Sequence, residues 1–259
     1  MSNLNNYTLI TGASQGIGLE FSKLFAKDKH NLIMVARDEK KLNELKVNFQ
    51  KEYGIKVYIL PIDLSVDNSC EKVFKFVDEK NITVDNLINN VGIGCFGFFH
   101  EGQDGFEERL ININIITLTK FTKHFIREMT ERKSGGILNV ASTAAFVGGP
   151  KMAMYYSSKA YVLSLTESLH DEVKDLGVRV SCLCPGPVKT GFQEKSGIKK
   201  SEKAKKYLMD ADKVAKQGYI GFLKGKAIII PGYKNKLLVF GNKFMPRALS
   251  RKIILMNNK

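Results

Sequence analysis

The sequence predicts an α/β protein in which helices flank a doubly wound parallel sheet of about seven strands, built as a single domain. Two observations support this fold class. Short apolar segments alternate regularly with amphipathic segments of helical length, and the first apolar segment runs directly into a glycine-rich turn and a helix. Strands that are apolar throughout are typical of parallel sheets covered by helices on both faces. The 259-residue chain shows neither an internal repeat nor an interdomain linker.

The expected elements alternate along the chain. Apolar segments predict strands at 7–10, 31–35, 56–60, 85–89, 136–140, 179–184 and 227–230. Amphipathic segments predict helices near 16–28, 39–53, 67–80, 104–132, 152–176 and 212–224. Ligands bind such sheets outside the carboxyl ends of the strands. The segments that follow residues 10, 89, 140 and 184 should therefore form one site.

The motif TGASQGIG occupies residues 11–18, between the first strand and the first helix. Gly12, Gly16 and Gly18 give the spacing G-x-x-x-G-x-G. Strand, glycine turn and helix form the setting of a Rossmann-type dinucleotide site, where the helix N-terminus faces the phosphates. Taken alone, the segment could also be a plain strand-to-helix turn.

Tyr155 and Lys159 are spaced one helical turn apart, and Ser142 precedes them. On a helix the two side chains share a face. An ammonium close to a phenol lowers the pKa of the tyrosine, which suits the pair for general acid–base chemistry. The spacing alone also occurs by chance in amphipathic helices.

Together these motifs resemble the short-chain dehydrogenase/reductase family, in its compact single-domain branch. The matching segments follow the family's order: TGASQGIG at 11–18, IDLS at 62–65, NNVG at 89–92, Asn114, Ser142, Tyr155-x-x-x-Lys159 and PGPVKT at 185–190. The resemblance implies one NAD(P)-binding Rossmann domain over residues 1–259. We expect a substrate lid at about 191–212 and a basic amphipathic extension at about 232–259.

The resemblance also implies an oxidoreductase that interconverts a carbonyl and an alcohol by hydride transfer. Tyr155 would donate the proton, and Ser142 would donate a hydrogen bond to the same oxygen. Lys159 would lower the tyrosine pKa and hold the nicotinamide ribose. Asn114 would keep a water in line with Lys159, although the neighbouring Asn112 could misplace that match. The alternative is a cofactor-binding sensor or scaffold with little catalytic activity.

Cofactor preference is expected at the end of the second strand. Ala36 stands where NAD-selective relatives carry an acid, and Arg37 follows, which favours NADP(H) over NAD(H). Asp38 is expected to point away. Gln15 departs from the basic residue that many NADP-selective relatives carry in the glycine turn, and Arg37 could instead be an exposed N-cap neighbour. The implied cofactor-binding residues are Gly12, Ser14, Gln15, Gly16, Ile17, Gly18, Arg37, Asp63, Leu64, Asn90, Gly92, Tyr155, Lys159, Pro185, Gly186, Val188 and Thr190. Asp63 could also serve as a helix N-cap.

The charge of +14 is spread over predicted helix faces, so it favours solvated surface over a nucleic-acid site. A dense basic segment at 194–206 could instead attract an acidic substrate or carrier. The four cysteines form no C-x-x-C and are expected to be reduced and structural, and the scattered histidines predict no metal site. No apolar run is long enough to span a membrane, and no signal pattern precedes the first strand. We therefore expect a cytoplasmic protein.

The expected substrate walls are aromatic, which favours a hydrophobic ketone or aldehyde, with a ketoacyl thioester as a variant. Their aromatic residues are Phe96, Phe98, Phe99, Phe146, Phe192 and Tyr207. A homodimer or homotetramer is expected through the helices at 104–132 and 152–176. The C-terminal extension should form a helix that packs on the domain or on a partner subunit. Weak membrane-surface association is the alternative.

Overall fold

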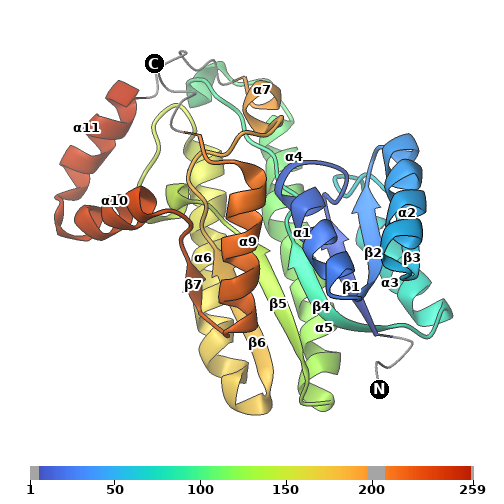
Figure 1. The fold of residues 1–259 in the computed structure, drawn as a ribbon. Helices are drawn as coiled ribbons and strands as arrows, with labels where there is room; N and C mark the ends of the chain where they lie inside the picture. The colour runs from blue at the N-terminus through green and yellow to red at the C-terminus, as the bar shows by residue number, and fades with distance from the viewer. Residues whose placement is uncertain (1–5, 198–207, 258–259) are drawn as a thin grey trace.

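A parallel sheet in the order β3-β2-β1-β4-β5-β6-β7 forms the centre of the computed structural model, which describes residues 6–197 and 208–257 (Figure 1). All of the predicted strands are present. They are β1 (Asn6–Thr11), β2 (Asn31–Ala36), β3 (Val57–Pro61), β4 (Thr83–Asn89), β5 (Gly135–Val140), β6 (Val178–Leu183) and β7 (Ile228–Ile229). The strand order reverses between β1 and β4, which is where ligands bind in sheets of this kind.

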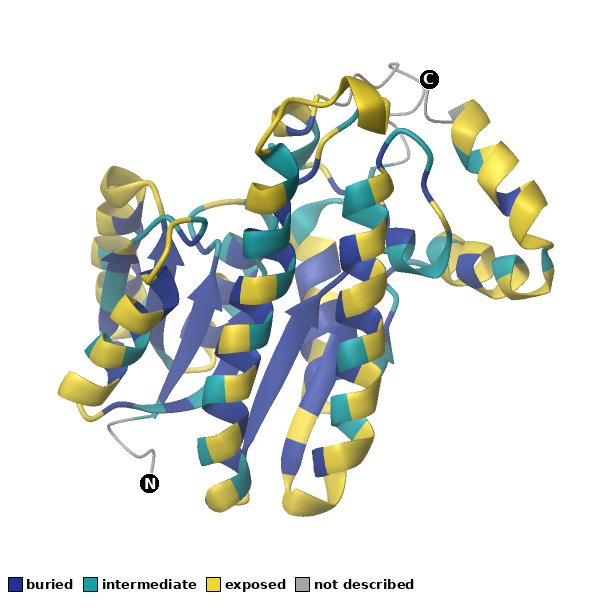
Figure 2. Ribbon diagram, turned by 180° about the vertical axis from the view of Figure 1, so that it is seen from behind, coloured by how far each residue is buried: buried dark blue, intermediate teal, exposed yellow. Residues whose placement is uncertain are grey.

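Helices cover both faces of the sheet. One core packs against α1 (Gly16–Lys27), α2 (Glu39–Tyr53) and α9 (Ala211–Leu223). A second core packs against α3 (Ser69–Glu79) and α5 (Leu118–Glu131). A smaller cluster lies under α6 (Ala153–Val173). In Figure 2 the strands are mostly dark blue and the outward sides of the helices are largely yellow, as this layering requires.

The predicted helix at 104–132 is not continuous. The chain forms α4 (Phe106–Ile111), a π-helical segment (Asn112–Thr117) and then α5. A π-helical turn holds one more residue than an α-turn, and such turns often lie at functional sites. The segment contains Asn114, whose side chain points to residues of other elements.

A buried polar ladder ties α5 and α6 to the centre of the sheet. Asn89 Nδ2 donates to Asn139 Oδ1 at 2.9 Å and to Thr122 Oγ1 at 3.1 Å. Asn139 Nδ2 in turn donates to Thr166 Oγ1 at 3.0 Å. Hydrogen-bonded polar groups in a core specify one arrangement of the elements that carry them. The ladder thereby fixes where α6, with Tyr155 and Lys159, sits on the sheet.

The C-terminal extension forms two helices where one was predicted. These are α10 (Tyr233–Phe244) and α11 (Arg247–Asn257), which project from the domain beside β7 (Figure 1). Met245, which precedes Pro246, is extended, with φ −88° and ψ 133°. Proline disfavours helical geometry in the residue before it, so the chain bends at this point.

Candidate active site

The glycine turn after β1 has the geometry of a phosphate cradle. Gly12 and Gly16 have φ of +67° and +57°, values that favour glycine. A Cβ on Gly18 would lie 2.3 Å from the Gly12 carbonyl oxygen, so only glycine fits there. The α1 N-terminus that follows has no acidic residue in its first turn, and no side chain from the described part of the chain caps it at Gln15. Its N–H groups and its dipole are therefore open to an anion, and the turn fits a dinucleotide pyrophosphate.

Thr11 connects this turn to the end of β4, a role that sequence reasoning missed. Its hydroxyl accepts hydrogen bonds from the Asn90 and Val91 backbone N–H groups at 3.0 and 3.1 Å. Asn90 Nδ2 donates to the carbonyls of Thr11 and Gly12 at 3.0 and 3.3 Å. The Asn90 side chain therefore holds the glycine turn in place. Thr11 is the first residue of the TGASQGIG motif, and its place in that motif was the signal from which its role could have been predicted.

Arg37 lies beside Asp63 at the ends of β2 and β3. Arg37 Nη1 is 3.7 Å from Asp63 Oδ2, and Arg109 Nη2 from α4 is 3.9 Å from the same oxygen. The other carboxylate oxygen of Asp63 accepts from the Ser65 backbone N–H and hydroxyl at 2.9 and 2.7 Å. Burial would raise the pKa of Asp63, but the Ser65 hydrogen bonds and the two guanidinium groups hold it below its usual value.

The structure also decides how Asp38 is oriented and whether Asp63 caps a helix at this edge of the sheet. Asp38 is the N-cap of α2 and accepts from the Lys41 backbone N–H at 2.9 Å, so it turns away from Arg37 as expected. The N-cap of α3 is Asn68, so Asp63 does not cap that helix. Sequence reasoning missed Arg109 because it lies on a different element and no recognisable motif surrounds it.

Ser142 and Tyr155 lie together where β5 meets α6. The Ser142 hydroxyl accepts from the Ala144 backbone N–H at 3.1 Å and hydrogen-bonds with the Tyr155 phenol. Burial raises the pKa of Tyr155 to about 12, and this hydrogen bond only partly offsets it.

Lys159 does not lower the tyrosine pKa in this structure, so that expectation was wrong. Its Nζ donates to the Val140 carbonyl at 2.9 Å and lies 5.8 Å from the centre of the Tyr155 ring. Burial lowers the pKa of Lys159 itself to about 8. Desolvation is the largest cause of the pKa shift of each group. Lys159 Nζ is also 3.3 Å from where a Cβ on Gly92 would stand, which brings the NNVG motif to the same place.

Asn114 reaches from the π-helical segment across to the end of β4. Its Oδ1 accepts from the Ile93 N–H at 2.9 Å, and its Nδ2 donates to the Ile93 carbonyl at 2.9 Å and to Ser158 Oγ at 3.0 Å. Both amide hydrogens are thus used within the protein. The side chain therefore holds the loop after β4 onto α6. Its expected role in keeping a water in line with Lys159 stays a prediction. Ser158 was missed, although it stands between Tyr155 and Lys159 in the motif.

The PGPVKT segment borders the glycine turn. The Pro185 carbonyl accepts from the Thr143 N–H at 2.8 Å, next to Ser142. A Cβ on Gly16 would come within 3.0 Å of the Thr190 methyl group. Val188 is buried, and Gly186 packs against the Asn235 side chain. The structure also brings Ser14, Ile17 and Leu64 to the same edge of the sheet, on the turn, on the first helix and after β3.

The expected aromatic walls are only partly formed. The Phe192 ring, on α7 (Phe192–Lys195), lies 5.3 Å from the Tyr155 ring, and the Phe96 N–H donates to the Ser196 carbonyl at 2.9 Å. Phe98 and Phe99 are 46 % and 64 % exposed, so they do not belong to the hydrophobic core. Phe146 is half-buried near α10. Residues 198–207 of the expected lid at 191–212, which include Tyr207, lie outside the described residues.

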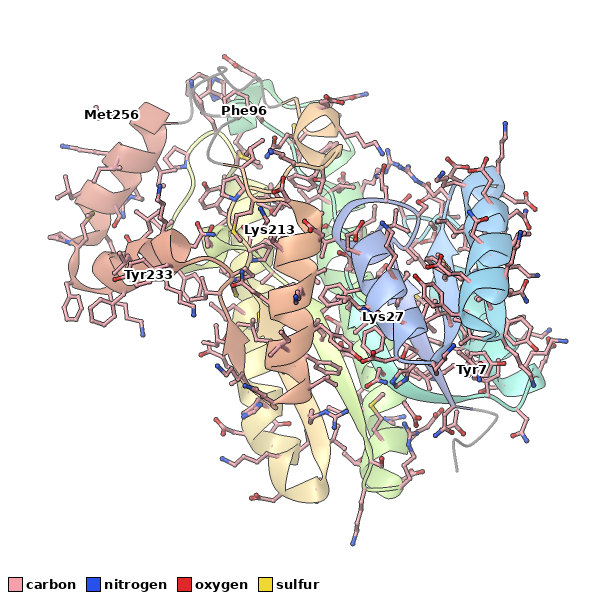
Figure 3. All side chains as sticks on the ribbon, viewed as in Figure 1. Tyr7, Lys27, Phe96, Lys213, Tyr233 and Met256 are labelled. Carbon is pink, nitrogen blue, oxygen red and sulfur yellow. The ribbon has the colours of Figure 1, made fainter. Side chains whose placement is uncertain are left out.

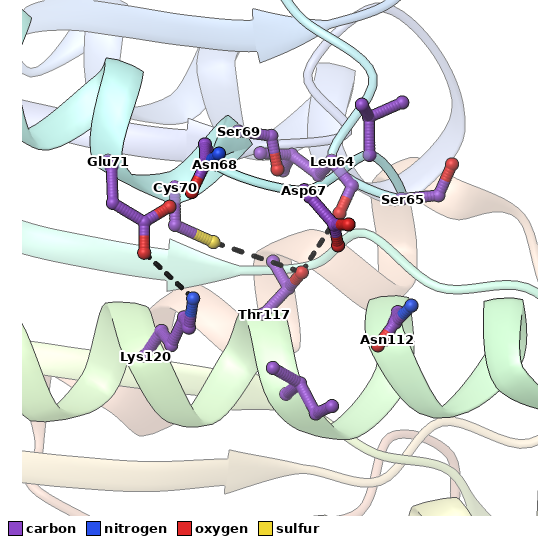
Figure 4. A pocket seen from close by; sticks show the side chains of 12 residues that line it. Leu64, Ser65, Asp67, Asn68, Ser69, Cys70, Glu71, Asn112, Thr117 and Lys120 are labelled. Carbon is purple, nitrogen blue, oxygen red and sulfur yellow. Dashed lines mark hydrogen bonds and ion pairs between the residues drawn. The ribbon is translucent and has the colours of Figure 1, made fainter.

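A separate pocket of about 280 Å³ lies between α3 and the π-helical segment (Figure 4). Among its lining residues, Thr117 Oγ1 donates to the Leu64 carbonyl at 3.0 Å, and Lys120 pairs with Glu71 at 2.7 Å. Among the described residues that line this pocket, only Leu64 is also a predicted cofactor-binding residue. The catalytic residues do not line it.

The cysteines are free thiols, as expected. Cys70, Cys182 and Cys184 are buried, but Cys95 is exposed, so its assignment as a structural residue was wrong. Asp78, His124 and Glu128 bring their ligand atoms within 4.8 Å of one another on the surface. His124 is stacked on Phe74 and spaced one turn from Glu128, an arrangement that packing on α5 explains.

Residues 6–201 match the short chain dehydrogenase family. The chain is 37 % identical over 190 residues to a very-long-chain 3-oxoacyl-CoA reductase-like protein of Arabidopsis thaliana, covering 71 % of this chain and 60 % of that protein. It is 29 % identical over 191 residues to the very-long-chain 3-oxoacyl-CoA reductase of Mus musculus, covering 72 % and 61 %. The matched region thus spans about three-fifths of the length of these curated relatives.

Among solved structures, the chain is similar to a short-chain dehydrogenase from Sphingobium yanoikuyae in complex with NADPH. The TM-score is 0.83 and the identity 28 %, covering 92 % of this chain and 94 % of that one. Within the described residues, none of the helices is both long and apolar enough to cross a bilayer. The match to the family, the strand order and the convergence of its motifs at one sheet edge agree, and the chain belongs to the short-chain dehydrogenase/reductase family.

Proposed function

We propose that the protein is an NADP(H)-dependent oxidoreductase that interconverts a ketone or aldehyde and the corresponding alcohol. The observation that carries this proposal is the convergence of Ser142, Tyr155 and Lys159 beside Gly92, in the segment that Asn90 joins to the glycine turn. A protein that only sensed the cofactor would be free to lose any of these groups.

The bound nicotinamide cofactor supplies a hydride to the carbonyl carbon. The electron pair of the C=O bond moves to oxygen, and the Tyr155 hydroxyl gives its proton to that oxygen. A pKa of about 12 keeps the phenol protonated at neutral pH, which suits proton donation. Ser142 donates a hydrogen bond to the same oxygen as its charge grows. Lys159 would contact the ribose, and its ammonium would then stabilise the phenolate that remains.

Support for NADP(H) comes from two arginines at the adenosine end of the site. Arg37 and Arg109 flank Asp63 and are 56 % and 45 % exposed, so both guanidinium groups are accessible. Arginine matches phosphate geometry through paired N–H donors. A 2′-phosphate would meet both groups, whereas the ribose hydroxyls of NAD(H) would leave them unused.

The substrate is proposed to be hydrophobic. Phe192 packs on Tyr155, and a Cβ on Gly94 would meet the Phe192 ring at 2.9 Å and Ser196 Oγ at 3.1 Å. An apolar wall thus adjoins the proton donor. The 3-oxoacyl-CoA reductases among the relatives support a ketoacyl thioester as the form of that substrate.

The proposed assembly is a homodimer or homotetramer formed through α4, the π-helical segment, α5 and α6. Ile116 and Tyr161 are 42 % and 37 % exposed there, and Tyr161 is hydrogen-bonded to Thr119 at 2.9 Å across the two helices. The four free thiols support a reducing compartment, and we place the protein in the cytoplasm on that basis.

The test is NADPH oxidation, followed by absorbance, against a panel of ketones, aldehydes and ketoacyl thioesters, with NADH in parallel. Tyr155→Phe should lower kcat by roughly 10²- to 10⁴-fold and leave NADPH binding nearly unchanged. Tyr156→Phe is the matched control, because it removes a neighbouring phenol from the same helix and should retain turnover. Retained turnover in Tyr155→Phe would refute the assignment. Tight NADPH binding without turnover on any compound would favour the sensor.

A further inference from the structure

The two C-terminal helices expose an apolar surface that the proposed chemistry does not use. Tyr233, Phe240 and Phe244 of α10 are 74 %, 61 % and 75 % exposed, and Leu237 between them is 52 % exposed. Helical residues turn by about 100° each, so these four side chains form one stripe along the helix. Exposed apolar stripes of this kind mark interaction surfaces.

The opposite side of α10 holds the helix on the domain. Val239 is 7 % exposed. Asn235 Nδ2 donates to the Pro231 carbonyl at 2.8 Å, and Asn242 Nδ2 donates to the Phe146 carbonyl at 2.9 Å. The usual pattern of a surface helix, with its apolar side inward, is therefore reversed. The stripe faces solvent because the polar side of α10 already packs on the domain.

α11 repeats the arrangement. Leu249, Ile253 and Met256 share one side and are 49 %, 37 % and 68 % exposed. Ser250, on a different side, is buried and hydrogen-bonds with Asn242 of α10. We refer to Tyr233, Leu237, Phe240, Phe244, Leu249, Ile253 and Met256 together as the C-terminal apolar face. Figure 3 labels its two ends, Tyr233 and Met256, on the helices that project from the domain.

The charges around this face indicate what covers it. Residues 233–257 contain no aspartate or glutamate, and their charged residues are all basic: Lys234, Lys236, Lys243, Arg247, Arg251 and Lys252. A second copy of the same face would bring like charges together, whereas an anionic surface is complementary. With 12 and 11 residues, the helices are too short to span a bilayer, which takes about 20.

We propose that the C-terminal apolar face docks on an anionic phospholipid bilayer, with α10 and α11 lying in the plane of the interface. Apolar side chains would enter the acyl boundary, and the flanking lysines and arginines would meet the headgroups. The face adjoins the site, because Asn242 holds Phe146 and the Arg251 stem packs near Gly148, both in the segment after Ser142. Docking would therefore bring the site close to membrane-dissolved acyl chains, a consequence that rests on the proposed function, whereas the docking itself does not.

The sequence contains no tryptophan, so a single introduced indole reports on its own position. In Phe244→Trp, vesicles of equimolar phosphatidylglycerol and phosphatidylcholine should shift the emission to the blue, and added salt should weaken the shift. Vesicles of phosphatidylcholine alone should give a smaller shift. Val47→Trp is the control, because Val47 is 62 % exposed on α2, outside the face. Its emission should stay unchanged with either vesicle.

Co-sedimentation with the same vesicles gives an independent measurement. The double variant Leu237→Ser, Phe240→Ser should lose roughly tenfold in affinity for each side chain removed. Val66→Ser with Leu176→Ser removes exposed apolar side chains elsewhere and should bind as the unmodified chain does. Circular dichroism verifies that both variants fold.

Three results would overturn the docking: no emission shift with any vesicle, equal binding by the double variant and the unmodified chain, or a dimer that the double variant abolishes without vesicle binding. The last would assign the face to a second copy. If the protein binds vesicles but reduces no carbonyl, that result would support the docking and contradict the proposed function.

Discussion

Arg37 Nη1 and Asp63 Oδ2 lie 3.7 Å apart at the ends of two neighbouring strands, and Arg109 approaches the same oxygen at 3.9 Å from α4. A single carboxylate thus positions two guanidinium groups at the edge where the adenosine end of a dinucleotide would bind. The pair is half-exposed, so its own attraction adds little stability. Under the proposed preference for NADP(H), its role would be to orient the two guanidinium groups toward a 2′-phosphate.

Substitution of Arg37 should therefore change cofactor preference more than turnover. Arg37→Ala should lower kcat/KM for NADPH by on the order of tenfold to a hundredfold, because a charge-assisted contact with the 2′-phosphate is lost. Arg109→Ala should show a smaller loss of the same kind. The values for NADH should barely change in either variant. Arg127→Ala, an exposed arginine of α5, is the control. An unchanged ratio of NADPH to NADH activity in Arg37→Ala would contradict the NADP(H) preference.

Lys159 should make the free energy of unfolding rise with pH. Burial lowers its pKa to about 8 in the folded protein, against about 10.4 in an unfolded chain. The unfolded chain therefore holds more protons between these values, and the cost of burying a charged lysine disappears as pH rises through this window. Lys159→Met should stabilise the protein by about 2 kcal/mol more at pH about 7 than at pH about 9.5.

Urea denaturation at several pH values measures this difference. The burial that raises the pKa of Tyr155 to about 12 acts in the opposite direction, because it costs stability once an unfolded tyrosine ionises near about 10. The window below that pH therefore isolates the lysine. Lys123→Met, at an exposed position of α5, should show no such difference. Parallel pH profiles for the unmodified chain and Lys159→Met would rule the burial effect out.

Asn114 should contribute to stability through its contacts with Ile93 and Ser158. Asn114→Ala removes hydrogen bonds at 2.9, 2.9 and 3.0 Å and leaves partners without them. The expected fall in the free energy of unfolding is about 2–3 kcal/mol, because unpaired buried groups are costly. Asn112→Ala is the matched control in the same segment and should cost under about 1 kcal/mol. Equal losses in the two variants would show that the Asn114 contacts are not specific.

Gly18 should tolerate no side chain. A Cβ there would stand 2.3 Å from the Gly12 carbonyl oxygen and 2.5 Å from Asn90 Nδ2, and the first of these is backbone that must shift. Gly18→Ala is expected to cost about 3 kcal/mol and to abolish cofactor binding, which calorimetry can follow. Gly241→Ala on α10 meets no atom within 4 Å, and should raise stability by about 0.5–1 kcal/mol. A folded Gly18→Ala with normal cofactor affinity would speak against the cradle.

Phe192 should select for hydrophobic substrates. Its ring lies 5.3 Å from that of Tyr155, so a bulky apolar group next to the carbonyl would contact it. Phe192→Ala should lower kcat/KM for aromatic ketones by roughly tenfold to a hundredfold and change it little for acetone. Phe99→Ala, which removes a ring that is 64 % exposed, is the control. A uniform loss over all ketones would instead indicate damage to the proton donor.

The sequence by itself determined the sheet, the glycine cradle and the Tyr155–Lys159 pair. These depend on local patterns: apolar strand segments, glycines where φ is positive or a Cβ would clash, and a spacing of one helical turn. The continuous helix at 104–132 was wrong because an α-helical pattern carries no sign of the extra residue in a π-helical turn. Asn114 in that segment is hydrogen-bonded to Ile93 and Ser158, contacts that a helical pattern does not show either.

Only the tertiary structure decided the surroundings of these groups. Arg109 meets Asp63 because α4 and the end of β3 are brought together by the sheet order. The tyrosine pKa is raised because burial, which sums over many elements, outweighs the hydrogen bond with Ser142. The sequence also did not reveal that the apolar stripe beginning at Tyr233 faces outward. The same spacing of apolar residues is found on a helix whether that side packs on a core or faces solvent. Burial and long-range contacts belong to the whole fold, and no local pattern contains them.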